Sequence, residues 1–167
     1  LIIHDPKGEI NKHMYRELEK EGYKVIVLDY RRPLRGDRYN PLEYPSKLYR
    51  EGNTSRAAEM FLAFGETMFS DRKSEKDPYW NLTASSYLTG LSLLQAELLP
   101  EKECTINHLY DLHIQGDKKY GCSKYIKEVY CRPGAKESSS YKLAAPAINA
   151  PNDTQGGLYS VYTSCLT

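Results

Sequence analysis

Four residues near the start of the chain have the types and spacing of an anion or metal site. Asp5, Lys7, Gly8 and Glu9 directly follow the short apolar run Leu1–His4. A carboxylate can hold a hydrated cation, a lysine can reach an anion, and a glycine lets backbone N–H groups approach it. If the run is a strand of a parallel sheet, these residues lie at its carboxyl end, where open α/β sheets bind ligands. A plain turn between a strand and a helix explains the same residues equally well.

Basic side chains gather in two further segments of the chain. Residues 30–45 hold four arginines against two acidic residues. Residues 116–132 interleave lysines with tyrosines, a mixture of charge and aromatic surface that suits nucleic acid. Half-buried tyrosines on a solvated amphipathic helix are the favoured interpretation of this second segment. The candidate contacts to nucleic acid or to a partner are Arg31, Arg32, Arg35, Arg38, Lys118, Lys119, Lys124 and Lys127.

The spacing of the remaining residues supports no zinc site, nucleotide-binding loop or cysteine nucleophile. Cys104, His108, His113 and Cys122 match no usual zinc pattern, and we interpret them as buried thiols and surface histidines. The dinucleotide-binding motif needs three glycines, and only Gly8 occurs before the first predicted helix. No Gly-x4-Gly-Lys-Ser/Thr phosphate loop occurs in the sequence. No base partner for a cysteine nucleophile is identifiable. We therefore predict no metal site and no catalytic residue in this chain.

Hydrophobic periodicity predicts the elements that position these residues. Residues 1–4 and 23–28 are typical of strands buried on both faces, and residues 9–21 have the spacing of an amphipathic helix. Strand, helix and strand in this order predict a βαβ unit with parallel strands. Residues 30–45, which contain three prolines, are predicted to form an irregular connection. Helices are then predicted from about Thr54 and over 78–99, 104–114, 118–130, 138–148 and 154–166.

Length and composition limit the class of protein. The chain has 167 residues, of which 40% are hydrophobic and 27% charged, with a formal net charge of +1. These values exclude a disordered charged tail and a globally basic nucleic-acid-binding protein, and they predict no membrane span. Four cysteines and no export signal favour a reducing, cytosolic setting. Because the chain begins at Leu1 rather than at Met, we interpret it as a fragment of a longer protein.

Four motifs in order resemble the type IV secretion coupling proteins, the TraG-like ATPases of conjugative DNA transfer. The motifs are Asp-Pro-Lys-Gly-Glu at 5–9, Gly-Tyr-Lys-Val at 22–25 leading into Val-Leu-Asp at 27–29, Tyr-Asn-Pro-Leu at 39–42, and Asp-Pro-Tyr-Trp at 77–80. Each motif is weak alone, but four in register over the first eighty residues are specific. Beyond Pro100 the resemblance rests on helical character.

This resemblance implies a RecA-like nucleotide-binding domain that is interrupted by an all-α domain. The expected fold is mainly α, with a helical domain of roughly six helices attached to a truncated βαβ piece of the RecA-like α/β domain. Residues 1–50 would belong to the nucleotide-binding domain, including its basic linker. Residues 51–150 would form the all-α substrate-recognition domain, and residues 151–167 a return helix toward the first domain.

The resemblance also implies a function and partners. The chain would be the substrate- and DNA-recognition module of a conjugative coupling ATPase, linking relaxosome DNA, relaxase or another secreted protein to the secretion channel. The longer protein would be a homohexamer at the cytosolic face of the bacterial inner membrane and would bind ATP and Mg²⁺, with Asp5, Lys7, Gly8 and Glu9 near the nucleotide. This chain itself is expected to hold no cofactor, to hydrolyse no ATP and to make no membrane contact.

An enzyme from another class is the alternative hypothesis. In it, the chain is a small α/β phosphotransfer or hydrolase domain with a helical cap, and it uses Asp5 and Lys7. Such an enzyme needs further strands to build its sheet, and no buried apolar run of β-branched residues follows Asp29.

Overall fold

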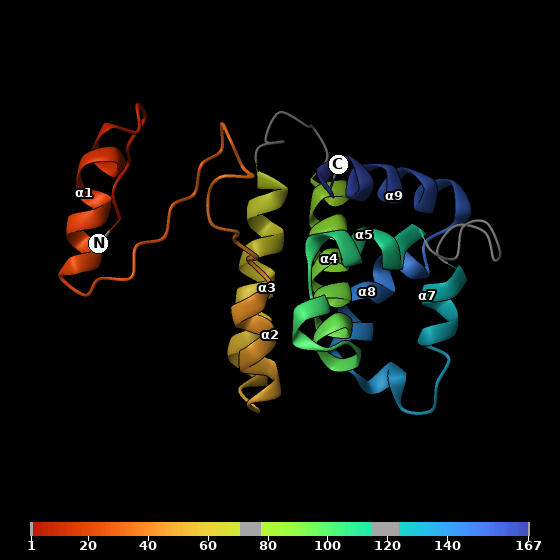
Figure 1. The fold of residues 1–167 in the computed structure, drawn as a ribbon. Helices are drawn as coiled ribbons and strands as arrows, with labels where there is room; N and C mark the ends of the chain where they lie inside the picture. Colours follow the sequence, from red (N-terminus) through yellow and green to blue (C-terminus); the bar gives the residue numbers. More distant parts are fainter. Residues whose placement is uncertain (1, 71–77, 115–123, 167) are drawn as a thin grey trace. The chain divides into compact units, whose positions relative to one another are not determined.

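The computed structural model describes residues 2–70, 78–114 and 124–166, which are mainly helical (Figure 1). The chain divides into two compact units, Leu1–Tyr39 and Asn40–Thr167. The mainly α class is thus confirmed, whereas the assignment of residues 1–50 to a nucleotide-binding domain stays a prediction.

The first unit is built on helix α1 (Glu9–Lys20), which confirms the helix predicted over 9–21. Glycines flank it on both sides: Gly8 and Gly22 have φ of 75° and 85°, in the left-handed region that glycine adopts without steric cost. After Gly22 the chain leaves the helix, and the backbone N–H of Tyr23 donates to the carbonyl of Leu18 at 3.0 Å. Glycine at this position is a common helix stop.

The βαβ piece is not shown by the structure. Residues 2–4 and 23–28 form no strand, and no strand occurs elsewhere in the described ranges. The large side chains of these two runs that were predicted to be buried, Ile2, Ile3, Ile26 and Leu28, are exposed. The physical reason is that a strand needs neighbours for its backbone hydrogen bonds, and two short runs rarely make a stable sheet.

The second unit is organised around one long helix, α4 (Tyr79–Leu98). Helices α3 (Thr54–Met68), α8 (Ser139–Ile148) and α9 (Asn152–Leu166) make the largest sets of contacts with it. The remaining described elements are α2 (Glu43–Arg50), η2 (Glu101–Glu103), α5 (Ile106–Ile114), α7 (Lys124–Val129) and η3 (Ala135–Glu137).

Most of the predicted helices of this unit are confirmed. The helix predicted from Thr54 and those over 78–99, 104–114, 138–148 and 154–166 all form, with ends shifted by no more than two residues. Ser138 caps α8 as a helix-starting serine should, since its Oγ accepts the backbone N–H of Tyr141 at 3.1 Å. Of the helix predicted over 118–130, residues 118–123 lie outside the described ranges and Lys124–Val129 is helical.

Helix α2 is the element that the sequence analysis missed. Residues up to Pro45 were predicted to be irregular, but Pro45 is the third residue of α2 and is buried. The first turn of a helix has no internal partner for its N–H groups, so a proline there costs no hydrogen bond. Pro45 therefore does not oppose the helix that it occupies.

Helix α4 is buried on every side rather than along one stripe. All residues from Thr83 to Ala96 except Ser86 are buried. Two hydroxyls in this stretch bond back to their own helix: Thr89 Oγ1 donates to the carbonyl of Ser85 at 2.9 Å, and Ser92 Oγ to that of Leu88 at 2.8 Å. Internal pairing of this kind removes the cost of burying a hydroxyl. The buried Ser85 Oγ has no hydrogen-bond partner among the described residues.

Glycines allow neighbouring helices to approach α4 closely. A Cβ on Gly65 of α3 would lie 2.9 Å from Ser85 Oγ and 3.0 Å from Thr89 Oγ1. A Cβ on Gly90 of α4 itself would lie 2.7 Å from the carbonyl oxygen of Ser140 and 2.9 Å from the backbone nitrogen of Ala144, both on α8. Real side-chain atoms do not approach backbone this closely, so glycine sets the spacing of these helices.

Gly90→Ala is expected to lower the free energy of unfolding by about 1–3 kcal/mol, because the added methyl group must push the backbone of α8 away. Gly156→Ala is the matched control, since Gly156 lies in α9 and its Cβ would meet nothing within 4 Å. That change should raise the free energy of unfolding by about 0.5–1 kcal/mol through helix propensity. Urea denaturation followed by circular dichroism measures both, and a Gly90→Ala variant as stable as the unchanged chain would contradict the packing argument.

Candidate nucleic-acid interface

The Asp5 carboxylate stabilises the start of α1. Its Oδ2 accepts the backbone N–H of Asn11 at 2.8 Å, and the backbone N–H of Gly8 donates to the Asp5 carbonyl at 3.2 Å. The N–H of Asn11 is the main group that lowers the pKa of Asp5 below its usual 3.8. Lys7 and Glu9 are exposed and form no ion pair with any described residue. The four predicted residues thus share one end of α1, but the Asp5 carboxylate is engaged by the helix.

Asp5 should titrate below pH 3.8, because its native pKa is lowered. A lowered pKa means that the carboxylate stabilises α1 above the pKa of the unfolded chain, and that this contribution is lost as the pH falls through the native value. Carboxyl ¹³C NMR measures the midpoint, with the urea-unfolded chain as reference. Asp5→Ala should also speed hydrogen exchange at the Asn11 amide. A native midpoint at or above the unfolded one would refute the capping role.

The arginine turn, which we define as residues 30–38, is anchored at its start by Asp29. Asp29 Oδ1 accepts the backbone N–H groups of Arg31 and Arg32, each at 3.0 Å, and Oδ2 accepts Arg32 Nε at 3.2 Å. These donors, led by the backbone N–H of Arg32, lower the pKa of Asp29 from its usual 3.8. The backbone N–H of Arg35 then donates to the carbonyl of Arg32 at 2.8 Å and closes a tight turn.

The far end of the turn is fastened to the segment before it. The backbone N–H of Asp37 donates to the carbonyl of Val27 at 2.7 Å, and the N–H of Val27 donates to Asp37 Oδ2, also at 2.7 Å. Between these bonds Gly36 fits so closely that a Cβ would lie 2.7 Å from the Val27 carbonyl oxygen. The carboxylates of Asp29 and Asp37 therefore both accept backbone N–H groups, Asp29 from the turn and Asp37 from the segment before it.

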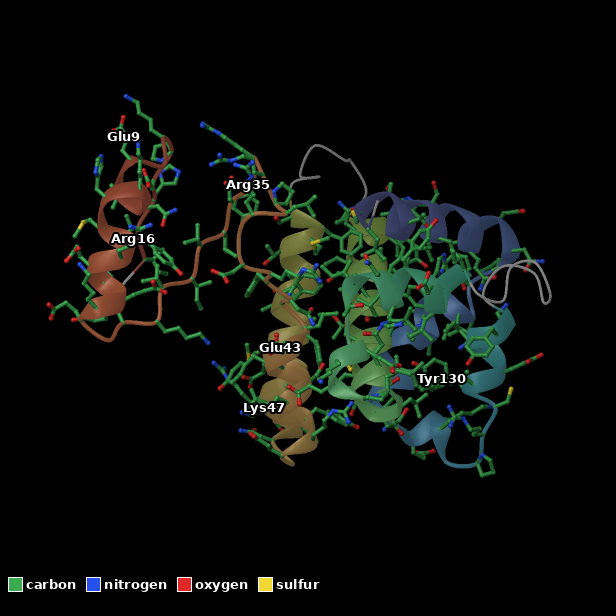
Figure 2. All side chains as sticks on the ribbon, in the orientation of Figure 1. Glu9, Arg16, Arg35, Glu43, Lys47 and Tyr130 are labelled. Atoms are coloured by element: carbon green, nitrogen blue, oxygen red, sulfur yellow. The ribbon has the colours of Figure 1, made fainter. Side chains whose placement is uncertain are left out.

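The arginine side chains of the turn are accessible to solvent. Arg31, Arg32, Arg35 and Arg38 are all exposed. Arg32 pairs with Asp29, whereas the other three have no ion pair in the part of the chain that the structure describes. Figure 2 shows the Arg35 side chain extending away from the ribbon of the turn. We call these exposed arginines the cationic edge of the turn. The acids that neighbour them in the sequence, Asp29 and Asp37, are already bonded to backbone N–H groups, an arrangement suited to phosphate groups.

Among the predicted lysines, the structure describes the side chain of Lys127. Lys127 is half-buried, and its Nζ donates to Gln155 Oε1 at 3.4 Å. Lys118 and Lys119 lie outside the described residues, and of Lys124 the structure describes only its place in α7. Since Lys127 lies in the second unit and the arginines in the first, no cluster formed by both sets is described.

Two tyrosines of this second segment, Tyr125 and Tyr130, are described, and both pack against the core, whereas Tyr120 lies outside the described residues. Tyr130 is buried, and its hydroxyl lies 2.5 Å from Ser140 Oγ. Burial raises the pKa of Tyr130 to about 12. Tyr125 is half-buried against the core. Figure 2 labels Tyr130 in the second unit, where this ring serves packing.

A buried histidine is the feature that the sequence analysis misjudged. His113 was interpreted as a surface residue, but it is 4% exposed. Its Nδ1 lies 3.1 Å from the hydroxyl of Tyr87, and its ring centroid lies 4.8 Å from those of both Tyr159 and Tyr162. The i, i+3 spacing of the two α9 tyrosines was the available signal for a shared aromatic face. Cys104 is buried, as predicted.

A metal site finds no support in the described residues, which contain no group of three His, Cys, Asp or Glu able to hold an ion. None of the described helices is long and apolar enough to cross a membrane.

Over residues 1–167 the chain matches the family described as type IV secretory system conjugative DNA transfer. The chain belongs to this family. A search of curated proteins and of solved structures gave no significant match. The resemblance carried by four motifs in the first eighty residues is thereby confirmed, and the family match extends beyond Pro100, where those motifs end. Conjugative DNA transfer by type IV secretion is the process in which this family works.

Proposed function

We propose that this member of the conjugative DNA-transfer family recognises the DNA substrate and that the arginine turn makes the contact. The observation that carries the proposal is that the acidic residues beside and within the turn are engaged by backbone N–H groups, while the arginines are exposed. Asp29 and Asp37 accept these N–H groups, while Arg31, Arg35 and Arg38 are exposed without an ion pair among the described residues.

Phosphate binding follows from the chemistry of this edge. A guanidinium donates several hydrogen bonds in one plane and keeps its charge at every physiological pH, so it matches the oxygens of a phosphate. The turn is held by bonds at both ends, and less conformational entropy is lost when a preorganised loop binds. Contacts of this kind do not read the base sequence, so the proposal predicts binding without sequence preference.

The wider proposal follows the family resemblance. In it, residues 51–150 form the substrate-recognition domain, which also meets a relaxase or another secreted protein. Residues 1–50 and the helix at 151–167 belong to a RecA-like domain of a hexameric protein that uses ATP and Mg²⁺ at the cytosolic face of the membrane. The phosphotransfer alternative gains nothing from the geometry, because the Asp5 carboxylate already accepts the N–H of Asn11.

Removal of the three unpaired arginines tests the DNA contact. We compare the chain with Arg31→Gln/Arg35→Gln/Arg38→Gln by fluorescence anisotropy on labelled DNA between about 50 and 200 mM salt. Each lost phosphate contact lowers the slope of log K against log salt by about 0.7–0.9, so the triple variant should lose about two units of slope and most of its affinity at low salt.

The control removes the same charge elsewhere. Lys102→Gln/Lys136→Gln/Lys142→Gln replaces three exposed lysines of the second unit, and both triple variants carry a net charge of −2 where the chain has +1. The lysine variant should keep most of the slope and affinity. Equal losses in the two variants, or no DNA binding by the unchanged chain at low salt, would refute the proposal, and the second result would leave recognition of a protein to be tested.

A further inference from the structure

Large apolar side chains lie exposed within and beside the arginine turn. Tyr30 is 88% exposed, Leu34 96% and Tyr39 72%. Neither tyrosine has a ring contact or a side-chain hydrogen bond with any described residue. Exposed apolar residues are common on protein surfaces, and the first unit exposes others, such as Ile26 and Leu28. Tyr30 and Tyr39 differ from these two because an arginine directly adjoins each of them.

The two rings directly adjoin arginines that form no ion pair with any described residue. Tyr30 precedes Arg31, and Tyr39 follows Arg38. The residue just before each tyrosine–arginine pair is held by hydrogen bonds. The Asp29 carboxylate accepts backbone N–H groups, and Asp37 exchanges two hydrogen bonds with Val27. Each tyrosine thus lies next to an arginine and close to a backbone position that hydrogen bonds hold in place.

We infer that Tyr30 and Tyr39 are base-stacking side chains, so that the arginine turn prefers unpaired bases to continuous duplex. The inference rests on the proposed function and adds to it the form of nucleic acid that is bound. An arginine can hold a phosphate while the neighbouring ring lies on the base of the same nucleotide, and every base offers a flat face for this contact. In a continuous duplex the base faces are covered by their neighbours, so the rings find no partner there.

Stacking also explains why aromatic rather than aliphatic side chains stand at both positions. An exposed tyrosine brings a large, flat apolar surface with only two rotatable side-chain bonds, so little conformational entropy is lost when a base covers it. Its hydroxyl stays in water at the ring edge, which keeps the free chain soluble. Tyr44 of α2 is also exposed, at 59%, but it follows Glu43, whose charge repels phosphate.

The test separates the bases of the ligand from its phosphates. Anisotropy is measured with three labelled probes: an oligo(dT) of about 20 nucleotides, an abasic oligonucleotide of the same length, and a duplex. The unchanged chain should bind oligo(dT) about tenfold or more tightly than the abasic strand, because stacking on two rings contributes at least that factor. Duplex should bind less tightly than oligo(dT).

Tyr30→Leu/Tyr39→Leu should abolish the difference between oligo(dT) and the abasic strand. The slope of log K against log salt should not change in this variant, since the arginines remain. Tyr44→Leu is the matched control and should behave as the unchanged chain does. Circular dichroism checks the fold of each variant, and because all three rings are exposed, no loss of structure is expected.

Other outcomes overturn the inference in distinguishable ways. Equal affinity of the unchanged chain for oligo(dT) and for the abasic strand, with normal salt dependence, would overturn stacking and leave the phosphate contact standing. A tyrosine variant that loses affinity for both strands by the same factor would show that the rings support the loop rather than the bases. Absence of binding to all three probes at low salt would refute the proposed function itself.

Discussion

Burial of α4 on all sides is the constraint on which the second unit depends. A helix that contacts α3, α8, α9, α2 and α5 cannot carry bulky residues everywhere, because its neighbours must come close enough to exclude water. Small residues meet this requirement at Gly90 and at Ser85 and Thr89, against which Gly65 fits. The hydroxyls of Thr89 and Ser92 are tolerated in this core because they bond to carbonyls of the same helix. The sequence of α4 therefore reflects its neighbours as much as its own helical propensity.

Helix α4 was predicted only in part from the sequence. Periodicity predicted its position and its large apolar residues, since Leu88, Leu91 and Leu94 repeat at helical spacing and are buried. It did not predict that Ser85, Thr89 and Ser92 are buried too, because a polar residue counts as solvent-facing when only residue type is considered. Tertiary neighbours decide that question. His113 was misjudged for the same reason, since the tyrosines that surround it come from α4 and α9, far away in the sequence.

Local structure in the first unit was predictable only where it needed no distant partner. Helix α1 satisfies its own backbone, with Gly8 and Gly22 at its ends, and it forms as predicted. The apolar runs at 2–4 and 23–28 need strand neighbours, and their composition alone does not provide them. The arginine turn lies between these cases. Its four arginines were visible in the sequence, but Asp37 was counted against them, although its carboxylate accepts the N–H of Val27.

The bonds made by these acids make a near-neutral chain compatible with the proposed DNA contact at the arginine turn. A net charge of +1 gives the chain as a whole little long-range attraction to a polyanion such as DNA. Within the turn, however, Asp29 and Asp37 are engaged by backbone amides, and their charge stabilises the loop that presents the arginines. Attraction is then confined to one short, rigid segment and falls off within about 8–10 Å at physiological salt. In the proposed contact with DNA, the position of the charges therefore matters more than their total number.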